Sequence, residues 1–454
     1  MREGRERRHI PSWVVKWGIP GTLSALLVAQ GVFSLQQART VQTLRQQVAT
    51  AQQRAMLEVL STLSDIEMRL SKLLVSSGAV QGEKLLGDLV RQAEGVQSNL
   101  SQLPLRHEAI SGTMKFVNQL GDYAGVLSQN ITQGRPLSSQ DLQQLEGMLA
   151  NCAQLNEQLR GVEQDIVSGK AIGEAEQIFW QDQGENPPTM EQAAGKSNGI
   201  DYPSLVYDGP FSDGKHAGAP LALAGMPQIS VEQAMQAAVD FVGKERVRDV
   251  RRGINTQGVI PAYGVTVETE DGTLNVQVTQ QGGQILWMMP ESAGFGSGLD
   301  VGACALKAYE FLTAKGYGHV EPNYWQTYDG IAVINFATVQ DGALLYPDLV
   351  KVQVRMDTGA VVGLEANNYL MNHHARTGLA SVITKEEAAE MVSDRLEVDR
   401  VRLCIIPTER GERLCYEFGG DWSGSYYLVY IDAKDKQEIN ILKIIDTEGG
   451  RMSV

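Results

Sequence analysis

The residues best equipped for chemistry are crowded into one short stretch, DYPSLVYDGPFSDGKH, at positions 201–216. Asp208, Asp213 and His216 carry the oxygen and nitrogen atoms that bind a divalent metal. Asp201 and Asp208 supply the two carboxylates that an acid–base hydrolase would need. The stretch has no regular period that would place these groups on one face of a helix or strand. The sequence therefore favours neither a metal site nor a catalytic pair here.

A structural role fits the composition of the same stretch better. Its three aromatic side chains are suited to packing, its two prolines stiffen the backbone, and its Asp-Gly dipeptide favours a turn. We predict no metal, no cofactor and no catalytic residue in this chain. We predict instead a partner-binding or packing segment made of Tyr202, Pro203, Tyr207, Asp208, Pro210, Phe211 and Asp213.

Reactive residues are sparse in the rest of the chain. His373 and His374 are adjacent in a polar stretch, and we expect both to be solvated. The four cysteines form no CxxC pair, which predicts small packing residues rather than a metal site. Cys404 and Cys415 could face each other across a hairpin, and the sequence leaves a disulfide between them open. No GxSxG, HExxH or P-loop motif occurs, which agrees with a protein that is not an enzyme.

Composition limits the class of protein further. A chain of 454 residues is long enough for two to four domains. Its formal net charge of −15 repels phosphate and argues against a nucleic-acid partner. Gln, Leu and Ala dominate the first third, whereas Gly, Tyr and Val rise in the second half. This shift predicts helices first and strands later.

The N-terminal region has the pattern of a membrane anchor. Residues 17–35 contain no formal charge and are long enough to cross a bilayer as one helix. Arginines and a lysine precede this span, so the positive-inside rule places residues 1–16 in the cytoplasm and the rest of the chain outside it. A cleaved signal peptide is the alternative, but no clear cleavage site follows the span.

A helical segment is expected at residues 36–168. Apolar residues recur there at steps of three and four, and Gly78, Pro104 and the stretch TQGRPLSS interrupt the pattern. Short breaks favour a bundle over an elongated stalk, and either one offers a route to self-association. Residues 169–228 then form a linker that includes the aromatic segment.

The second half of the chain repeats itself three times. Each copy opens with a helical pattern, and the aligned first positions are good N-caps, namely Ser230, Asp300 and Thr384. A small residue for the packing face follows in each copy, namely Ala234, Cys304 and Ala388.

Strand patterns follow each of these helices, with hairpin turns at Asp271–Gly272 and Asp357–Gly359. The final turn of the third copy lacks the glycine. We predict an α+β protein in which a transmembrane helix and a helical bundle precede three tandem repeats with antiparallel sheets, at residues 229–298, 299–382 and 383–454.

The helix-then-strands unit resembles the PepSY domain. With the anchor, the helical segment and the stretch YPSLVYDGPFSD, the whole chain resembles the YpeB family of spore germination proteins. That resemblance implies an inner spore membrane protein whose C-terminal domains face the cortex. It also implies a SleB-type cortex-lytic enzyme as partner, which this protein would bind, stabilise or restrain.

Two other functions remain open at this point. The chain could itself hydrolyse peptidoglycan or peptides, with its site in residues 201–216. It could also be a signalling ectodomain, although no output domain precedes Trp13. The sequence leaves open which surface contacts the partner, whether the partner is inhibited or only stabilised, and the oligomeric state.

Overall fold

The computed structural model describes most of the chain but not its N-terminal region or its central linker. The described residues are 48, 50–51, 53–103, 107–167, 218–291, 294–408, 410–447 and 450–453. The predicted anchor at residues 17–35 and the aromatic segment at residues 201–216 both lie outside these ranges. Among the helices that the structure describes, none is long and apolar enough to cross a membrane.

The chain forms two compact units that do not follow the expected boundary between helices and strands. The first contains residues 1–67, 89–124 and 148–188. The second contains residues 68–88, 125–147 and 189–454. One end of the helical region therefore belongs to the same unit as the sheet.

Four stretches of helix make up the described part of the helical region. The first covers described residues 53–75, and the others are α2 (Ala79–Leu100), α3 (His107–Thr132) and α4 (Ser139–Val167). The breaks between them fall where Gly78, Pro104 and TQGRPLSS predicted them. A capping box starts α4, because Ser138 and Asp141 each accept a hydrogen bond from the other's backbone N–H, at 3.2 and 2.8 Å.

Neighbouring helices contact one another within each unit. In the first unit, the amide of Asn156 donates to Glu67 at 2.6 Å, beside the buried Leu63 and Leu159. In the second unit, Arg69 pairs with Asp88 at 2.7 Å. The apolar faces that the periodicity predicted are thus buried between helices.

The three repeats begin with the helices α6 (Val231–Val242), α7 (Val301–Ala314) and α9 (Lys385–Ala389). The predicted N-caps are confirmed, since Ser230, Asp300 and Thr384 each accept from the backbone N–H three residues later. The three aligned small residues are fully buried, as expected: Ala234, Cys304 and Ala388. Three short helices lie beside these elements along the chain, one before α6 and two between the repeat helices: η3 (Leu221–Leu223), η4 (Lys244–Arg246) and α8 (Asn367–Asn372).

Four strands follow each repeat helix, and a further strand ends the described chain. The first repeat has β1 (Val247–Arg252), β2 (Ala262–Thr269), β3 (Gly272–Thr279) and β4 (Ile285–Pro290). The second has β5 (Val320–Tyr328), β6 (Ile331–Gln340), β7 (Ala343–Arg355) and β8 (Val361–Glu365). The third has β9 (Glu397–Thr408), β10 (Gly411–Trp422), β11 (Ser425–Asp432), β12 (Glu438–Thr447) and β13 (Gly450–Ser453).

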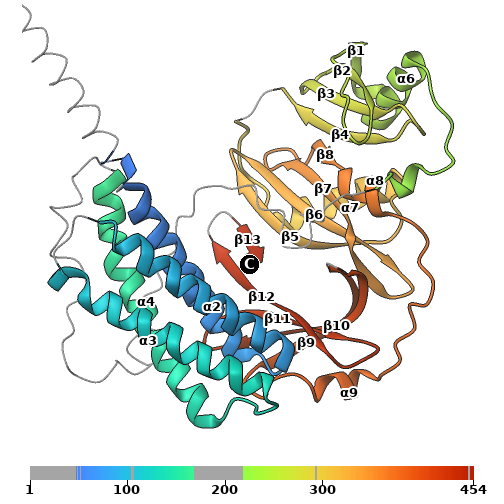
Figure 1. Ribbon diagram of the computed structural model, residues 1–454. Coiled ribbons are helices and arrows are strands. Elements are labelled where there is room, and N and C mark those ends of the chain that lie inside the picture. Colours follow the sequence, from blue (N-terminus) through green and yellow to red (C-terminus); the bar gives the residue numbers. More distant parts are fainter. Residues whose placement is uncertain are drawn as a thin grey trace, which may run out of the picture. The chain divides into compact units, whose positions relative to one another are not determined.

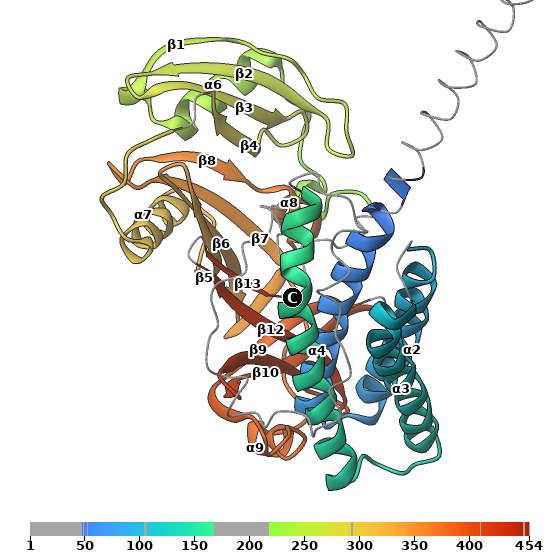
Figure 2. The same cartoon turned by 90° about the vertical axis from the view of Figure 1, so that its left-hand side faces the viewer.

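These strands form one sheet rather than the three separate sheets that we expected. Its order is β1-β2-β3-β4-β8-β7-β6-β5-β13-β12-β11-β10-β9, and Figure 2 shows β8 running beside the strands of the first repeat. Hydrogen bonds between β4 and β8 join the first two repeats. The pairing is antiparallel except between β7 and β9, which are parallel. The prediction of purely antiparallel sheets is therefore wrong at this junction.

The turns follow the glycines that predicted them. Gly272 and Gly359 have φ of 129° and 74°, where a side chain would be strained. In the third repeat, which lacks that glycine, Lys436 takes φ of 61° instead. The turn is held by the Asp432 carboxylate, which accepts from the backbone N–H of Lys434 at 2.7 Å.

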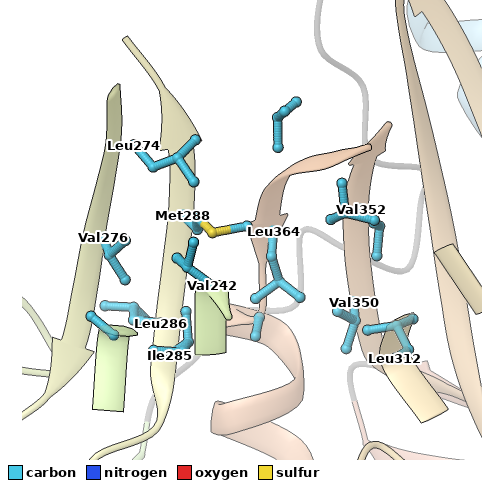
Figure 3. Packing of buried hydrophobic residues seen from close by; sticks show 14 of the residues in the cluster. Val242, Leu274, Val276, Ile285, Leu286, Met288, Leu312, Val350, Val352 and Leu364 are labelled. Carbon is cyan, nitrogen blue, oxygen red and sulfur yellow. The ribbon is translucent and has the colours of Figure 1, made fainter. Parts of the chain in front are cut away.

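The first two repeats share one hydrophobic core. It lies between the sheet and the helices α6 and α7, and Figure 3 shows Val242 and Leu312 from these helices beside strand residues such as Val276 and Val352. Phe241 and Phe311 meet edge to face at 5.3 Å. Because they share this core, the first two repeats form one layer of helices packed on one sheet (Figure 1).

Eight strands of the second and third repeats close into a ring, because β9 returns to pair with β7. We call this the strand ring; it runs β7-β6-β5-β13-β12-β11-β10-β9. Strand β6 and most of β7 are buried on both faces, since alternate residues point into two different cores. Phe336 belongs to the core under α7, whereas Ala337 belongs to the core inside the ring. This burial explains the near-continuous apolar runs in both strands.

Candidate functional site

An irregularity in β7 creates the most polar part of the sheet. Along the β6–β7 pair, Ala337 lies opposite Leu349 but the next residue, Thr338, lies opposite Leu345. The three residues between them bulge out of the ladder, and one of them is Pro347. A bulge turns side chains away from the positions that alternation would give them. Here it turns two polar residues, Tyr346 and Asp348, into buried surroundings.

Asp348 forms the centre of a charged cluster. It is fully buried and receives two hydrogen bonds from the Arg376 guanidinium, at 2.8 and 2.9 Å. Arg376 also reaches Glu412 of β10 through two hydrogen bonds, at 2.6 and 2.7 Å. His373 places its Nδ1 atom 2.7 Å from Asp348 and stacks on the ring of Tyr369. Residues of the second repeat, the connection after it and the third repeat thus meet at one guanidinium.

The electrostatics of Arg376 identify this cluster as a structural clamp. Burial by itself lowers the pKa of Arg376, but the hydrogen bonds and charges of Glu412 and Asp348 outweigh burial and raise it. The guanidinium is therefore always charged. Its N–H groups donate hydrogen bonds to two carboxylates, those of Asp348 and Glu412. A group in this state can hold two strands together but has no proton to exchange with a substrate.

A second polar cluster lies inside the strand ring. Glu417 of β10 is fully buried and faces Arg402 of β9 directly across the ladder, with Nε of Arg402 at 2.7 Å. The Tyr346 hydroxyl contacts Glu417 and also receives a hydrogen bond from Arg402 at 2.8 Å. Burial and the nearby Glu417 carboxylate raise the pKa of Tyr346, so its hydroxyl stays protonated. The second cluster, like the first, satisfies its own charges.

The first repeat contributes the exposed edge of the sheet, formed by β1. In the part of the chain that the structure describes, β1 bonds only to β2, whereas β9 at the other end of the order also bonds to β7. The strand is mostly exposed and its register shifts between Val247 and Asp249. Its arginines form exposed ion pairs with acidic residues on neighbouring elements: Arg248–Glu270, Arg251–Glu268 and Arg252–Glu232. Charges and a bulge are the usual protection of an edge against indiscriminate pairing.

The predicted site residues cannot be placed in this arrangement. Tyr202, Pro203, Tyr207, Asp208, Pro210, Phe211 and Asp213, and the metal candidate His216, all lie outside the described residues. Within the described ranges, no group of three or more His, Cys, Asp or Glu side chains is arranged to hold a metal. The predicted partner-binding segment stays a prediction.

The structure corrects the expectation for the histidine pair. His374 is exposed, as expected, but His373 is half-buried and bonded to Asp348. Cys404 and Cys415 do lie directly opposite each other on β9 and β10, and both are free thiols. Burial raises the pKa of each of these thiols, which keeps them unreactive.

Sequence reasoning missed the residues of both buried clusters. One signal was available for Asp348, which follows a proline inside the apolar run ALLYPDLVKVQV. A lone acid in such a run needs a partner because burying an unpaired charge is costly. No local pattern identified Arg376 or Glu412 as that partner, since they are brought to it only by the fold.

Family models match three parts of the chain. A model described as "YpeB sporulation, PepSY1 and PepSY2 domains" matches residues 194–378, and one described as "YpeB N-terminal" matches residues 40–172. A third, "Peptidase propeptide and YPEB domain", matches residues 382–442. The first match covers in a single model the two repeats that share a core.

Relatives match over almost the whole length. A protein named "Sporulation protein YpeB" from Halalkalibacterium halodurans is 26% identical over 449 residues, which cover 95% of this chain and 98% of the relative. A protein of the same name from Bacillus subtilis is 24% identical, covering 87% of this chain and 90% of the relative. The solved Bacillus megaterium YpeB C-terminal domain is 24% identical, with a TM-score of 0.44, and the match covers 48% of this chain and 99% of that domain. From the two YpeB family models and the near full-length matches to the two named sporulation proteins, we conclude that the chain belongs to the YpeB family of sporulation proteins.

Proposed function

We propose that this protein is a non-enzymatic, membrane-anchored partner of a SleB-type cortex-lytic enzyme. It would bind, stabilise or restrain that enzyme and so enable hydrolysis of the peptidoglycan cortex during germination. Family membership supports a role in sporulation, and the match of the third repeat to a model named for peptidase propeptides supports an interaction with a hydrolase.

The observation that carries the proposal is the sheet of thirteen strands with its single described open edge. Buried acidic residues that could serve in catalysis are instead held by arginines: Asp348 by Arg376 and Glu417 by Arg402. Such a sheet is suited to binding another protein at its edge, and its neutralised acids are poorly suited to catalysis.

Strand β1 is the surface that we propose for the enzyme partner. An extended segment of the enzyme would add to this edge, with main-chain hydrogen bonds giving affinity. The ion pairs on β1 are exposed, so their arginines can exchange acidic partners at little cost. Acidic side chains on the incoming segment would set the register.

Bonding along β1 identifies the groups that such a segment would meet. Gly253 donates to the carbonyl of Gly264, and hydrogen-bonded positions alternate along an antiparallel pair. The N–H of Arg252 therefore points away from β2. Proline at this position removes that donor, whereas alanine keeps it.

Co-purification of the full chain with a SleB-type enzyme tests the proposal. We expect capture by the unmodified protein and by Arg252→Ala, and about tenfold weaker capture by Arg252→Pro, roughly the loss of one main-chain hydrogen bond. Equal capture by both variants would remove β1 as the surface. No capture by any of them, with normal enzyme levels in spores that lack this protein, would contradict the proposed function itself.

The alternative is that the protein hydrolyses peptidoglycan or peptides with residues 201–216. Purified protein incubated with cortex fragments would then release soluble sugar or peptide, and Asp208→Asn would abolish the release. The absence of any product from the unmodified protein would exclude this alternative.

The location of the protein is part of the proposal. Residues 17–35 would anchor it in the inner spore membrane with residues 1–16 in the cytoplasm and the repeats facing the cortex. Self-association, if the protein forms a homo-oligomer, would take place through the helical region. Protease treatment of inverted and right-side-out membrane vesicles would establish the orientation.

A further inference from the structure

The third repeat is incomplete when it is compared with the other two. The helices α6 and α7 have 12 and 14 residues, but α9 has only five. After Ala389 the backbone of the third repeat continues in turns up to β9. A helix of five residues spans little more than one turn and covers only a small part of the sheet behind it. Something else must cover the apolar face that remains.

The end of the helical region supplies the missing cover. Val75, the last residue of the helix before α2, is fully buried and belongs to the core of the third repeat. That core contains Ile383, Val392 and Leu396 from the helical side of the repeat, together with side chains from β10, β11 and β12. The helical residues 68–88 accordingly belong to the same compact unit as the repeats.

A buried carboxylate holds this contact in place. Glu438, the first residue of β12, is 5% exposed and lies at the start of α2. It accepts hydrogen bonds from the Ser76 hydroxyl at 2.5 Å and from the Ser77 backbone N–H at 3.0 Å. The first N–H groups of a helix lack partners within the helix and attract negative charge. Glu438 therefore caps α2 from a distant part of the sequence.

Two further contacts make the fit specific. The Ser77 hydroxyl donates to the backbone carbonyl of Met391, in the turns that follow α9. Gly78 lies so close to Glu438 that an added Cβ would come within 2.6 Å of the Cβ of that residue. Position 78 accordingly has room only for glycine. A separate ion pair joins Arg395 to Glu146 of α4, also inside the second unit.

We propose that residues 75–78, here called the hairpin tip, act as the missing part of the third repeat's helix. The third repeat contains a docking site for the start of a helix, and its three features are the apolar hole that Val75 fills, the buried Glu438 carboxylate and the backbone carbonyl of Met391. The hairpin tip of this chain occupies the site. The helical region and the third repeat are thereby coupled, so that a change in one alters the stability of the other.

Hydrogen exchange of the full-length protein tests this coupling without any partner enzyme. We expect Gly78→Ala to speed the exchange of amides in β12 and in residues 383–396 by about tenfold, which corresponds to roughly 1.4 kcal/mol. Amides at residues 82–88 of α2 should accelerate with them. Exchange in β2 and β3 of the first repeat should not change. Gly87→Ala, on the same helix with nothing within 4 Å, is the matched control and should accelerate none of these amides, since alanine within a helix favours the helix.

A second pair of substitutions guards against general loss of folding. Val75→Asp places a charge in the apolar hole, whereas Val80→Asp places one at a position that is 65% exposed. We expect third-repeat exchange to rise with the first and not with the second. The proposal is overturned if third-repeat exchange stays at the unmodified rate in both Gly78→Ala and Val75→Asp. It is also overturned if the first repeat accelerates equally, because that would indicate global destabilisation instead of a local joint.

Discussion

At the scale of single residues, the most informative groups are charges that the fold has removed from water. Arg376 is 4% exposed and joins Asp348 to Glu412. Sequence reasoning identified neither Asp348 nor the groups that neutralise it, because Arg376 and Glu412 are brought to it only by the fold. The apolar residues around Asp348 are a sequence signal that its carboxylate is buried. No such signal surrounds Arg376 or Glu417.

Removing Arg376 should destabilise the junction of the second and third repeats. Arg376→Ala leaves Asp348 buried without its cation, which we expect to cost about 3–5 kcal/mol. Native-state hydrogen exchange of β7, β9 and β10 amides measures the loss. Arg252→Ala breaks an exposed pair and should cost about 0–1 kcal/mol in the same measurement. Similar effects from the two variants would refute the assignment of Arg376 as a clamp.

The aromatic segment leads to a prediction at the same scale. If Tyr207 and Phe211 pack or dock, then Tyr207→Ala or Phe211→Ala should reduce the abundance of the partner enzyme in spores, because alanine removes most of the apolar contact. Asp213→Asn should change it little. Immunodetection of the enzyme in spores carrying each variant separates these outcomes. A strong effect of Asp213→Asn alone would favour a catalytic or metal-binding role for the segment.

At the scale of elements, the sequence predicted helices, caps and turns well. Ser230, Asp300 and Thr384 cap helices because an N-cap depends on a few neighbouring residues. Local sequence patterns could not predict how the repeats are joined. The β4–β8 and β7–β9 pairings connect strands from different repeats, and no local pattern encodes which edge meets which. The same limit applies to α9, whose pattern continues beyond the five residues that form helix.

The turn between β11 and β12 allows a direct test of backbone strain. Lys436 has φ of 61°, which a glycine adopts without strain. We expect Lys436→Gly to raise the free energy of unfolding by about 0.5–1 kcal/mol, after a small loss from its exposed pair with Glu387. Thermal unfolding followed by near-ultraviolet circular dichroism would register the gain. The nearby Lys434→Gly is the control and should lower stability, since position 434 is not in the left-handed region.

At the scale of the whole molecule, the two compact units cut across the helical region and do not separate helices from strands. The second unit combines one end of the helices with all three repeats. Glu438 is a buried carboxyl where the hairpin tip meets the third repeat, and burial raises its pKa above the ordinary value of 4.5 in spite of the serine hydrogen bonds.

The raised pKa of Glu438 predicts how the junction responds to pH. The folded protein holds the Glu438 proton more tightly than the unfolded chain does. This residue therefore favours folding at low pH, and its contribution is lost as the pH rises from 4.5 through the raised pKa. The stability of Glu438→Gln minus that of the unmodified protein should increase with pH over this window, as measured by β12 hydrogen exchange at several pH values. A difference that stays constant across the window would contradict the prediction.

The strand ring also determines the order in which the chain can assemble. Its β5–β13 contact pairs Trp325 with Arg451, which are far apart in sequence, so we expect the second repeat to form before the third completes the ring. During that wait, one side of β5 and part of β7 offer unpaired backbone groups to any other nascent chain. Because it joins strands that are far apart in sequence, we expect ring closure to come late in folding. We therefore expect chains that have not yet closed the ring to be the species most prone to aggregation, which a concentration dependence of refolding yield would show.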